Sequence, residues 1–283
     1  MWCFMQLLGA IQNRQYHTYL EAGLNGFLFP LKDYACDYTN YYTLEDILSF
    51  QQNYPSATCF VVLNKMMYQK DLKPLVEILK TLKEYQVDGI LFYDTAIVYY
   101  NELYHLDLPL YLHQTHFACN HEMIDTYYNY GVHGAYLSNE LRKEEICHIA
   151  SNTKGKLLLL LEGYPVVAMS RRYLISNYQT MMSKKKTSHL TIKEPKSAQT
   201  FFLQEAKEGT TFRYGKRLNA SSIYQEVEPL ISFGVLEQAD LSSLEFLEVI
   251  RAYCHFDKKK LDTLLGHNRG FYYRNMVYQV KRK

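Results

Sequence analysis

The 283-residue sequence lacks several features that would place it in a specialised class of protein. It has no apolar run of the roughly 18–20 residues that a membrane helix needs; the longest, Leu157–Leu161, is flanked by Lys156 and Glu162. Its net charge is only +2, so bulk charge advertises neither a nucleic-acid nor a membrane partner. The first residues lack the basic and apolar regions of a secretory signal. We therefore expect a cytoplasmic protein with no membrane partner.

Cysteine is sparse, and its spacing indicates neither disulfides nor a metal site. The six cysteines stand at positions 3, 36, 59, 119, 147 and 254, with no CxxC pair. In a reducing compartment they are most simply free thiols. Cys36 and Cys119 follow predicted strands, where either could serve as a nucleophile beside a histidine, but a buried inert thiol is the simpler interpretation.

Tryptophan is nearly absent, whereas other aromatic residues are abundant. A single Trp stands against 27 Tyr and 14 Phe. Tyrosine has a large apolar body with one polar tip, so it suits half-wet cavity walls and stacking platforms as well as cores. The same excess could follow from genomic composition, and the sequence leaves both explanations open.

Short apolar runs alternate with amphipathic helical stretches such as Asp71–Tyr85. The runs are too uniformly apolar to alternate faces, as expected of parallel strands buried on both sides. Glycines recur where helices are expected to end and strands to begin, which favours one repeated connection. We predict an α/β fold, a (β/α)8-like barrel, with an open doubly wound sheet as the alternative. The expected strands are Phe4–Leu8, Gly26–Phe29, Thr58–Leu63, Gly89–Phe92, Pro109–Leu112, Gly134–Leu137, Lys156–Leu161 and Val235–Glu237.

The alternation breaks between about Asn177 and Leu218. A lysine-rich polar loop is followed by three short β segments, at His189–Lys193, Thr200–Glu205 and Thr210–Tyr214. We assign residues 1–178 and 219–265 to the barrel and 179–218 to a small β insertion between strands seven and eight. Residues 266–283 form a basic, Tyr-rich tail.

In a parallel barrel, functional groups gather on the loops that follow the carboxyl ends of the strands. Asp94, His113 and Glu162 stand there as candidate catalytic acids and bases. Polar strand ends are also found in any barrel, so this convergence has a purely structural alternative. The candidate substrate-binding residues at the same end are Lys32, Asn64, Asn120, Arg171, Arg172 and Glu237.

The adjacent Arg171 and Arg172 suit a carboxylate or phosphate through bidentate hydrogen bonds. The alternative is a structural ion pair with Glu162 or Glu237. The lysine runs 184–186 and 258–260, with the basic end 281–283, could contact phosphates but are more commonly just solvated. His113, His116 and His121 are zinc-ligand types, yet no HExxH or cysteine pair supports them, so we predict no metal site.

Several segments resemble the collagenase-like peptidases, peptidase family 32 of unassigned catalytic mechanism. The similarity runs colinearly through nearly the whole chain, and the residues from Glu162 to Tyr178 stand where that family has its signature. For members that hydroxylate RNA bases or act in quinone hydroxylation, the resemblance implies an iron–sulfur cluster held by cysteines. The other matching segments are Leu20–Gly23, Phe29–Tyr34, Thr43–Ile47, Val62–Asn64, Val87–Asp94, Asn120, Gly131–Leu141, Arg251–Tyr253 and Asn268–Phe271.

The departures from that signature concern its chemistry. Glu162 takes the place of the signature histidine, and Val166 and Tyr173 take the places of its cysteines. A cluster needs about four thiolates, and the sequence has no cysteine between Cys147 and Cys254. We therefore predict no cofactor and do not expect an iron–sulfur cluster.

Two functions follow from the resemblance and from the residues. The first is a divergent hydrolase or peptidase acting in the barrel mouth, with a peptide or RNA substrate. The second is a non-catalytic, cluster-free paralogue that binds RNA or a partner subunit and is related to RNA-hydroxylation proteins.

Overall fold

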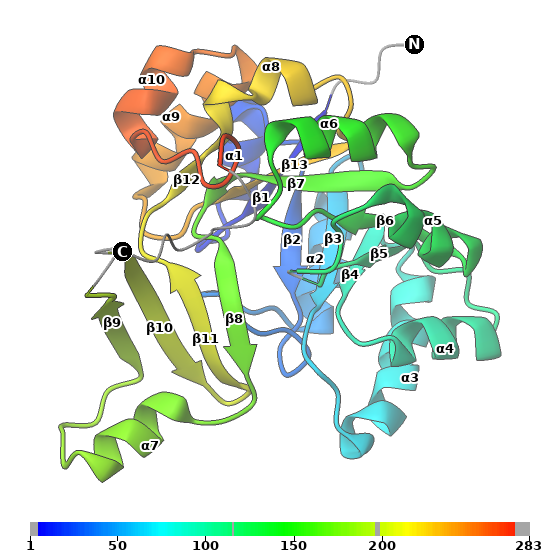
Figure 1. The fold of residues 1–283 in the computed structure, drawn as a ribbon. Helices are drawn as coiled ribbons and strands as arrows, with labels where there is room; N and C mark the ends of the chain where they lie inside the picture. Colours follow the sequence, from blue (N-terminus) through cyan, green and yellow to red (C-terminus); the bar gives the residue numbers. More distant parts are fainter. Residues whose placement is uncertain (1–4, 115, 196–198, 275–283) are drawn as a thin grey trace.

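The protein is described by a computed structural model over residues 5–114, 116–195 and 199–274, in which eight parallel strands form a closed barrel (Figure 1). Closure comes from β6 pairing with β7 and from β13 pairing with both β7 and β1. The predicted barrel is thus confirmed, and the open-sheet alternative is wrong. Its strands are β1 (Gln6–Ala10), β2 (Gly26–Pro30), β3 (Thr58–Leu63), β4 (Gly89–Phe92), β5 (Leu110–Leu112), β6 (Val132–Tyr136), β7 (Lys156–Gly163) and β13 (Phe233–Glu237).

These strands are apolar on both faces because one face fills the barrel and the other lies under helices. All of β2 and β4 is buried, and β7 is buried from Leu157 onward. The first strand lies two residues later than predicted, because Gln6 is in register with Phe233 of β13. Phe4, where we expected it to begin, falls outside the described residues.

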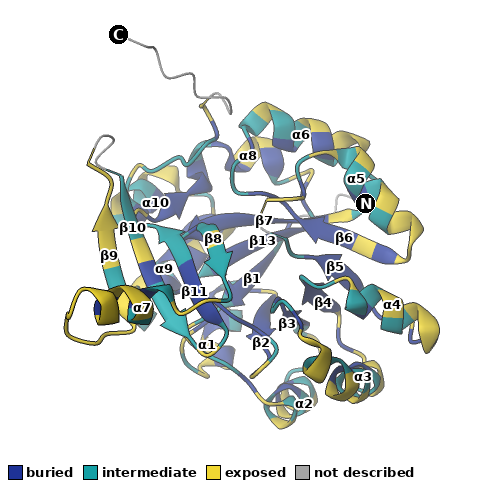
Figure 2. Ribbon diagram, turned by 60° about the horizontal axis from the view of Figure 1, so that its bottom comes forward, coloured by how far each residue is buried: buried dark blue, intermediate teal, exposed yellow. Residues whose placement is uncertain are grey.

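Helices ring the barrel with their apolar faces turned inward (Figure 2). Thr43 and Ser242 begin helices through capping boxes, in which each hydroxyl accepts a hydrogen bond from the N–H three residues later. No helix within the described ranges is both long and apolar enough to cross a bilayer. The surrounding helices are α1 (Tyr16–Ala22), α2 (Leu44–Asn53), α3 (Gln69–Glu84), α4 (Ala96–Leu103), α5 (His121–Asn129), α6 (Lys143–Asn152), α8 (Tyr224–Val227), α9 (Ser243–Cys254) and α10 (Lys258–Leu265), with a 3-10 turn, η1 (Ala220–Ser222).

A four-stranded antiparallel sheet, which we call the insertion sheet, projects from the carboxyl end of the barrel beside β1 and β2 (Figures 1 and 2). Its strand order is β8-β11-β10-β9, and α7 (Leu174–Met181) lies at its far end. The sequence predicted three of these strands but not the half-exposed β8, which falls in the range 1–178 that we assigned to the barrel. The strands are β8 (Val166–Ser170), β9 (His189–Lys193), β10 (Thr200–Ala206) and β11 (Gly209–Tyr214).

The chain returns to the barrel through β12 (Leu218–Asn219), which pairs antiparallel with the end of β7. The described part of the tail, 266–274, packs on the barrel. Tyr272 is buried and its hydroxyl donates to the carbonyl of Leu160 at 3.3 Å. The rest of the predicted tail, 275–283, lies outside the described residues.

Candidate functional site

The carboxyl end of the barrel, which we call the mouth, is bridged by an arginine from the insertion sheet. Arg213 of β11 contacts Asp37, which follows β2, and Glu237 at the end of β13. Its Nε donates to Asp37 Oδ1 at 2.9 Å, its Nη1 to Glu237 Oε2 at 2.9 Å, and its Nη2 to the Asp37 carbonyl at 2.6 Å. Nη1 also donates to the carbonyl of Tyr164 at 2.9 Å. Arg213 therefore ties the insertion sheet to two barrel strands.

A second arginine, Arg217, lies at the start of the return to the barrel and binds another pair of acids. Its guanidinium contacts the carboxyl groups of the fully buried Glu162 of β7 and of Asp240 after β13. It also donates to the carbonyl of Glu237 at 3.0 Å. Burial raises the pKa of Glu162 to about 8, against the opposing effect of Arg217. Glu162 Oε1 is buried with no hydrogen-bond partner in the described part of the chain.

Sequence reasoning missed both arginines. They follow the β insertion, far along the chain from Glu162 and Asp37, and no local motif marks them. The alternative interpretation, an ion pair of Arg171 or Arg172 with Glu162 or Glu237, is wrong: Glu162 contacts Arg217 and Glu237 contacts Arg213. Within the described ranges, Arg171 and Arg172 have no carboxylate within 4.0 Å.

The mouth brings three of the predicted residues around one small cavity. Asn64, His113 and Glu237 line it together with Asp37 and Arg213, and its volume is only about 30 Å³. Burial, with a smaller contribution from Arg213, lowers the pKa of His113 to about 4. The ring is thus neutral at physiological pH, and its buried Nδ1 has no partner among the described groups. The cavity is about the share of liquid volume taken by one water.

Other predicted residues have local structural contacts. Asp94 accepts from the N–H of Met67 at 2.9 Å and from that of Ala96 at 3.0 Å, which holds the start of α4. Asn120 is the N-cap of α5 and accepts from Met123 at 2.8 Å. Lys32 and Arg172 are exposed. The structure does not bring these four side chains into the mouth cavity.

The thiols and histidines of the mouth show no sign of activation. Cys36 is buried, and burial raises the pKa of its thiol, as it does for Cys119. His116 contacts the carbonyl of Val167 at 2.7 Å. Among residues 5–114, 116–195 and 199–274, no three His, Cys, Asp or Glu side chains come together as metal ligands.

Larger cavities lie between the mouth and the inner face of the insertion sheet. Phe202 is in register with Arg213, and Gln204 with Thr211, so these side chains share the face turned to the mouth. One cavity, which we call the aromatic cavity, measures about 440 Å³ and is lined by Ile11, Leu28, Tyr38, Tyr164 and Phe202, among others. The rings of Tyr164 and Phe202 meet edge-on at 5.4 Å.

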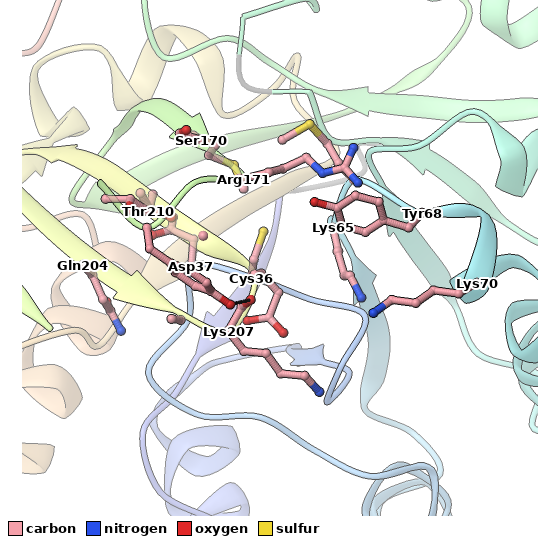
Figure 3. A pocket seen from close by; sticks show the side chains of 17 residues that line it. Cys36, Asp37, Lys65, Tyr68, Lys70, Ser170, Arg171, Gln204, Lys207 and Thr210 are labelled. Carbon is pink, nitrogen blue, oxygen red and sulfur yellow. Dashed lines mark hydrogen bonds between the residues drawn. The ribbon is translucent and has the colours of Figure 1, made fainter. Parts of the chain in front are cut away.

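A second cavity, the basic cleft, lies on the other side of Asp37 and Gln204, which line both (Figure 3). It measures about 380 Å³, and its cationic lining residues are Lys65, Lys70, Arg171 and Lys207. The aromatic cavity and the basic cleft together form what we call the groove. The groove, rather than the mouth cavity, has the volume of a ligand site.

The family model for peptidase family U32 matches residues 25–235 of this chain, from β2 to β13. The chain belongs to peptidase family U32. The predicted resemblance is thus confirmed.

Known proteins similar to this U32 chain include one curated relative. It is 23% identical over 225 residues to the "tRNA hydroxylation protein P2" of Bacillus subtilis (strain 168), covering 76% of this chain and 72% of the relative. Among solved structures, phosphoribosyl anthranilate isomerase from Thermus thermophilus is 10% identical with a TM-score of 0.49, covering 92% of this chain and 99% of that one. A member of the enolase superfamily from Listeria innocua is 11% identical with a TM-score of 0.40; the match covers 56% of this chain and 43% of that protein.

An iron–sulfur cluster does not fit the described side chains of this U32 chain. Cys59 is buried within β3, and Cys147 and Cys254 lie on the outer helices α6 and α9. Cys36 and Cys119 are at the mouth end, but a cluster needs about four thiolates. Cys3 lies outside the described residues. That the protein has no cofactor stays a prediction, which iron analysis and the visible absorption spectrum of purified protein test.

Proposed function

We propose that this U32 chain is an RNA-binding protein that takes part in the modification of tRNA and holds RNA in the groove between the mouth and the insertion sheet. The observation that carries the proposal is the contrast between two spaces. The mouth cavity, bridged by Arg213, has room for about one water, whereas the aromatic cavity has about 440 Å³. Ligand pockets measure roughly 300–1,000 Å³.

The lining of the groove suits RNA. Proteins that bind single-stranded RNA stack bases on exposed aromatic rings and follow the backbone with cations. Phe202 and Tyr164 supply rings in the aromatic cavity, and the basic cleft supplies cations. The name of the curated relative, a tRNA hydroxylation protein, agrees with this chemistry.

The experiment compares two neighbouring phenylalanines on opposite faces of β10. Phe202 faces the groove, whereas Phe201 faces away and packs on Tyr214 at 5.7 Å. We expect Phe202→Ala to weaken tRNA binding about tenfold in fluorescence anisotropy, since one base–aromatic stack is worth roughly 1–3 kcal/mol. Phe201→Ala, checked for folding by circular dichroism, should bind as wild type. Equal losses in both variants, or no tRNA binding by wild type at low salt, would refute the proposal.

A hydrolase acting through Glu162 is the second candidate. The raised pKa of Glu162 would keep a proton there at neutral pH, as a general acid requires. Against it, Glu162 is fully buried, is bound by Arg217 and does not line the mouth cavity. Peptide or RNA turnover that is lost in a folded Glu162→Gln variant would favour this candidate over binding alone.

A further inference from the structure

The basic cleft contains two cations that form no ion pair with a described residue. Lys65 is paired with Asp71 at 3.4 Å and Lys207 with Asp33 at 2.6 Å. Arg171 and Lys70 have no carboxylate within 4.0 Å among the described residues. Of the two lining acids, Asp37 is bound by Arg213, and Glu208 is left to oppose them. The cleft therefore has an excess of positive charge that its own carboxylates do not neutralise.

Both of these cations are placed against one tyrosine ring. The guanidinium carbon of Arg171 lies 3.2 Å from the centre of the Tyr68 ring, and the ammonium of Lys70 lies 5.9 Å from it. Figure 3 shows the side chains of Lys65 and Lys70 reaching toward the same space beneath the ring. Like charges that are held close together repel one another. A bound anion would offset this repulsion, so a group of cations with few acids is typical of an anion site.

The guanidinium of Arg171 is held in place but is short of hydrogen-bond acceptors. Its Nε and Nη2 are buried and have no partner in the described structure. Stacking on Tyr68 orients the planar fork, and a phosphate accepts two parallel hydrogen bonds from such a fork. An anion in the cleft would supply the missing acceptors once the side chain rotates to present these two atoms to it.

The backbone around Arg171 is fixed by a glycine of the opposite strand. Gly209 has φ +129°, and a Cβ there would lie 2.0 Å from the carbonyl oxygen of Ser170 and 2.8 Å from Cα of Arg171. On the other wall, Tyr68 is the N-cap of the 16-residue helix α3. The first turn of this helix already holds an acid, because Asp71 Oδ2 accepts from the N–H of Tyr68 at 2.8 Å.

We propose that the basic cleft binds a phosphate group, with Arg171 as the bidentate donor and Lys70 and Lys65 as further cations. That this phosphate belongs to an RNA backbone rests on the proposed function, whereas the anion site itself does not. Arg172, exposed and next in the chain, is outside the site.

The test measures inorganic phosphate and a single-stranded RNA separately on wild type, Arg171→Met and Arg172→Met. Phosphate affinity is measured in all three proteins by isothermal titration calorimetry, and in wild type the bound site is located by the ¹H–¹⁵N signal of the arginine Nε groups. RNA binding is followed by anisotropy over a series of salt concentrations. We expect wild type to shift its Arg171 signal with phosphate. Arg171→Met should weaken binding of both ligands about tenfold and lower the slope of log K against log salt by about 0.7, while Arg172→Met changes either affinity by less than twofold.

The outcomes separate the two proposals. The anion site is refuted if wild type does not bind phosphate, or if Arg172→Met weakens phosphate binding as much as Arg171→Met does. This holds whatever Phe202→Ala does to tRNA binding. If Arg171→Met no longer binds phosphate yet binds RNA normally, the site binds a free phosphorylated molecule. Its assignment to the RNA backbone is then overturned. A Tyr68→Leu variant, which removes the stacking surface, should also weaken phosphate binding if Arg171→Met does so through the site rather than through misfolding.

Discussion

Each of the two arginines at the mouth donates hydrogen bonds to several acceptors, most of which are buried or half-buried. Arg213 bonds Asp37, Glu237 and two carbonyls, and Arg217 bonds Glu162, Asp240 and the carbonyl of Glu237. Breaking a buried pair on one side costs far more than the pair is worth, because the remaining charge is left in a poorly solvated site. The arginines therefore explain why acids can stand at the ends of apolar strands.

At this scale we predict that Arg213→Met destabilises the fold by about 3–5 kcal/mol, since Asp37 and Glu237 lose their cation in a buried site. Urea unfolding followed by circular dichroism measures this. The matched control, Arg172→Met, removes an exposed arginine and should stay within about 0.5 kcal/mol of wild type. A loss below about 1 kcal/mol in Arg213→Met would mean that the two acids are solvated or protonated without Arg213.

Glu162 gives the chain a pH dependence of a definite sign. Its pKa is raised from 4.5 to about 8, so the folded chain binds this proton more tightly than the unfolded chain. The stability from this group is fully present below the unfolded pKa and is lost as pH rises through about 8. Glu162→Gln removes that loss. We therefore compare the free energies of unfolding of Glu162→Gln and wild type at each pH. The difference, variant minus wild type, should increase by at least about 1 kcal/mol between about pH 5 and pH 8. A fall over that range would show that Glu162 is ionised and stabilised by Arg217.

At the scale of elements, the barrel closes where β6 pairs with β7. A glycine on β6, Gly134, lets the backbones of these two strands come close together. A Cβ at Gly134 would lie 1.7 Å from the carbonyl oxygen of Lys156, whereas at Gly155 the nearest atom is a methyl of Ile124 at 3.0 Å. Backbone cannot yield as a flexible side chain can. The pairing of these two strands therefore limits position 134 to glycine.

We accordingly predict that Gly134→Ala costs about 1–3 kcal/mol through forced separation of the strands and that Gly155→Ala costs less. Thermal unfolding of the two variants side by side provides the comparison. If Gly155→Ala proved the more damaging, the register in which β6 pairs with β7 would be incorrect.

The elements also show how far the sequence alone could lead. The buried parallel strands were predictable because both of their faces are apolar, and Thr58–Leu63 and Gly89–Phe92 were placed at their observed bounds. β8 was not, because its residues are half-exposed and carry no clear period. Arg213 and Arg217 were not predicted for another reason. Their partners depend on where the insertion sheet lies relative to the mouth, and no local sequence pattern encodes that position.

At the scale of the whole molecule, the insertion sheet changes what the barrel can offer a ligand. A barrel normally exposes its strand ends as the site, but in this chain the insertion sheet stands beside those ends and the side chain of Arg213, from β11, bridges the mouth. The cavities that are large enough for a ligand therefore lie in the groove, between the insertion sheet and the barrel. The net charge of only +2 agrees with RNA binding in the groove. The electrostatic attraction for RNA would come from the basic cleft and not from the whole surface.

The most direct test of the account is photo-crosslinking of the full chain to tRNA containing 4-thiouridine, followed by mass spectrometry of the linked peptides. We expect links to β10, at or beside Phe202, and to the segment around Tyr164. We also expect Phe202→Ala to remove the first of these. Links confined to the outer helices α4–α6, with none in the groove, would contradict the proposed binding site.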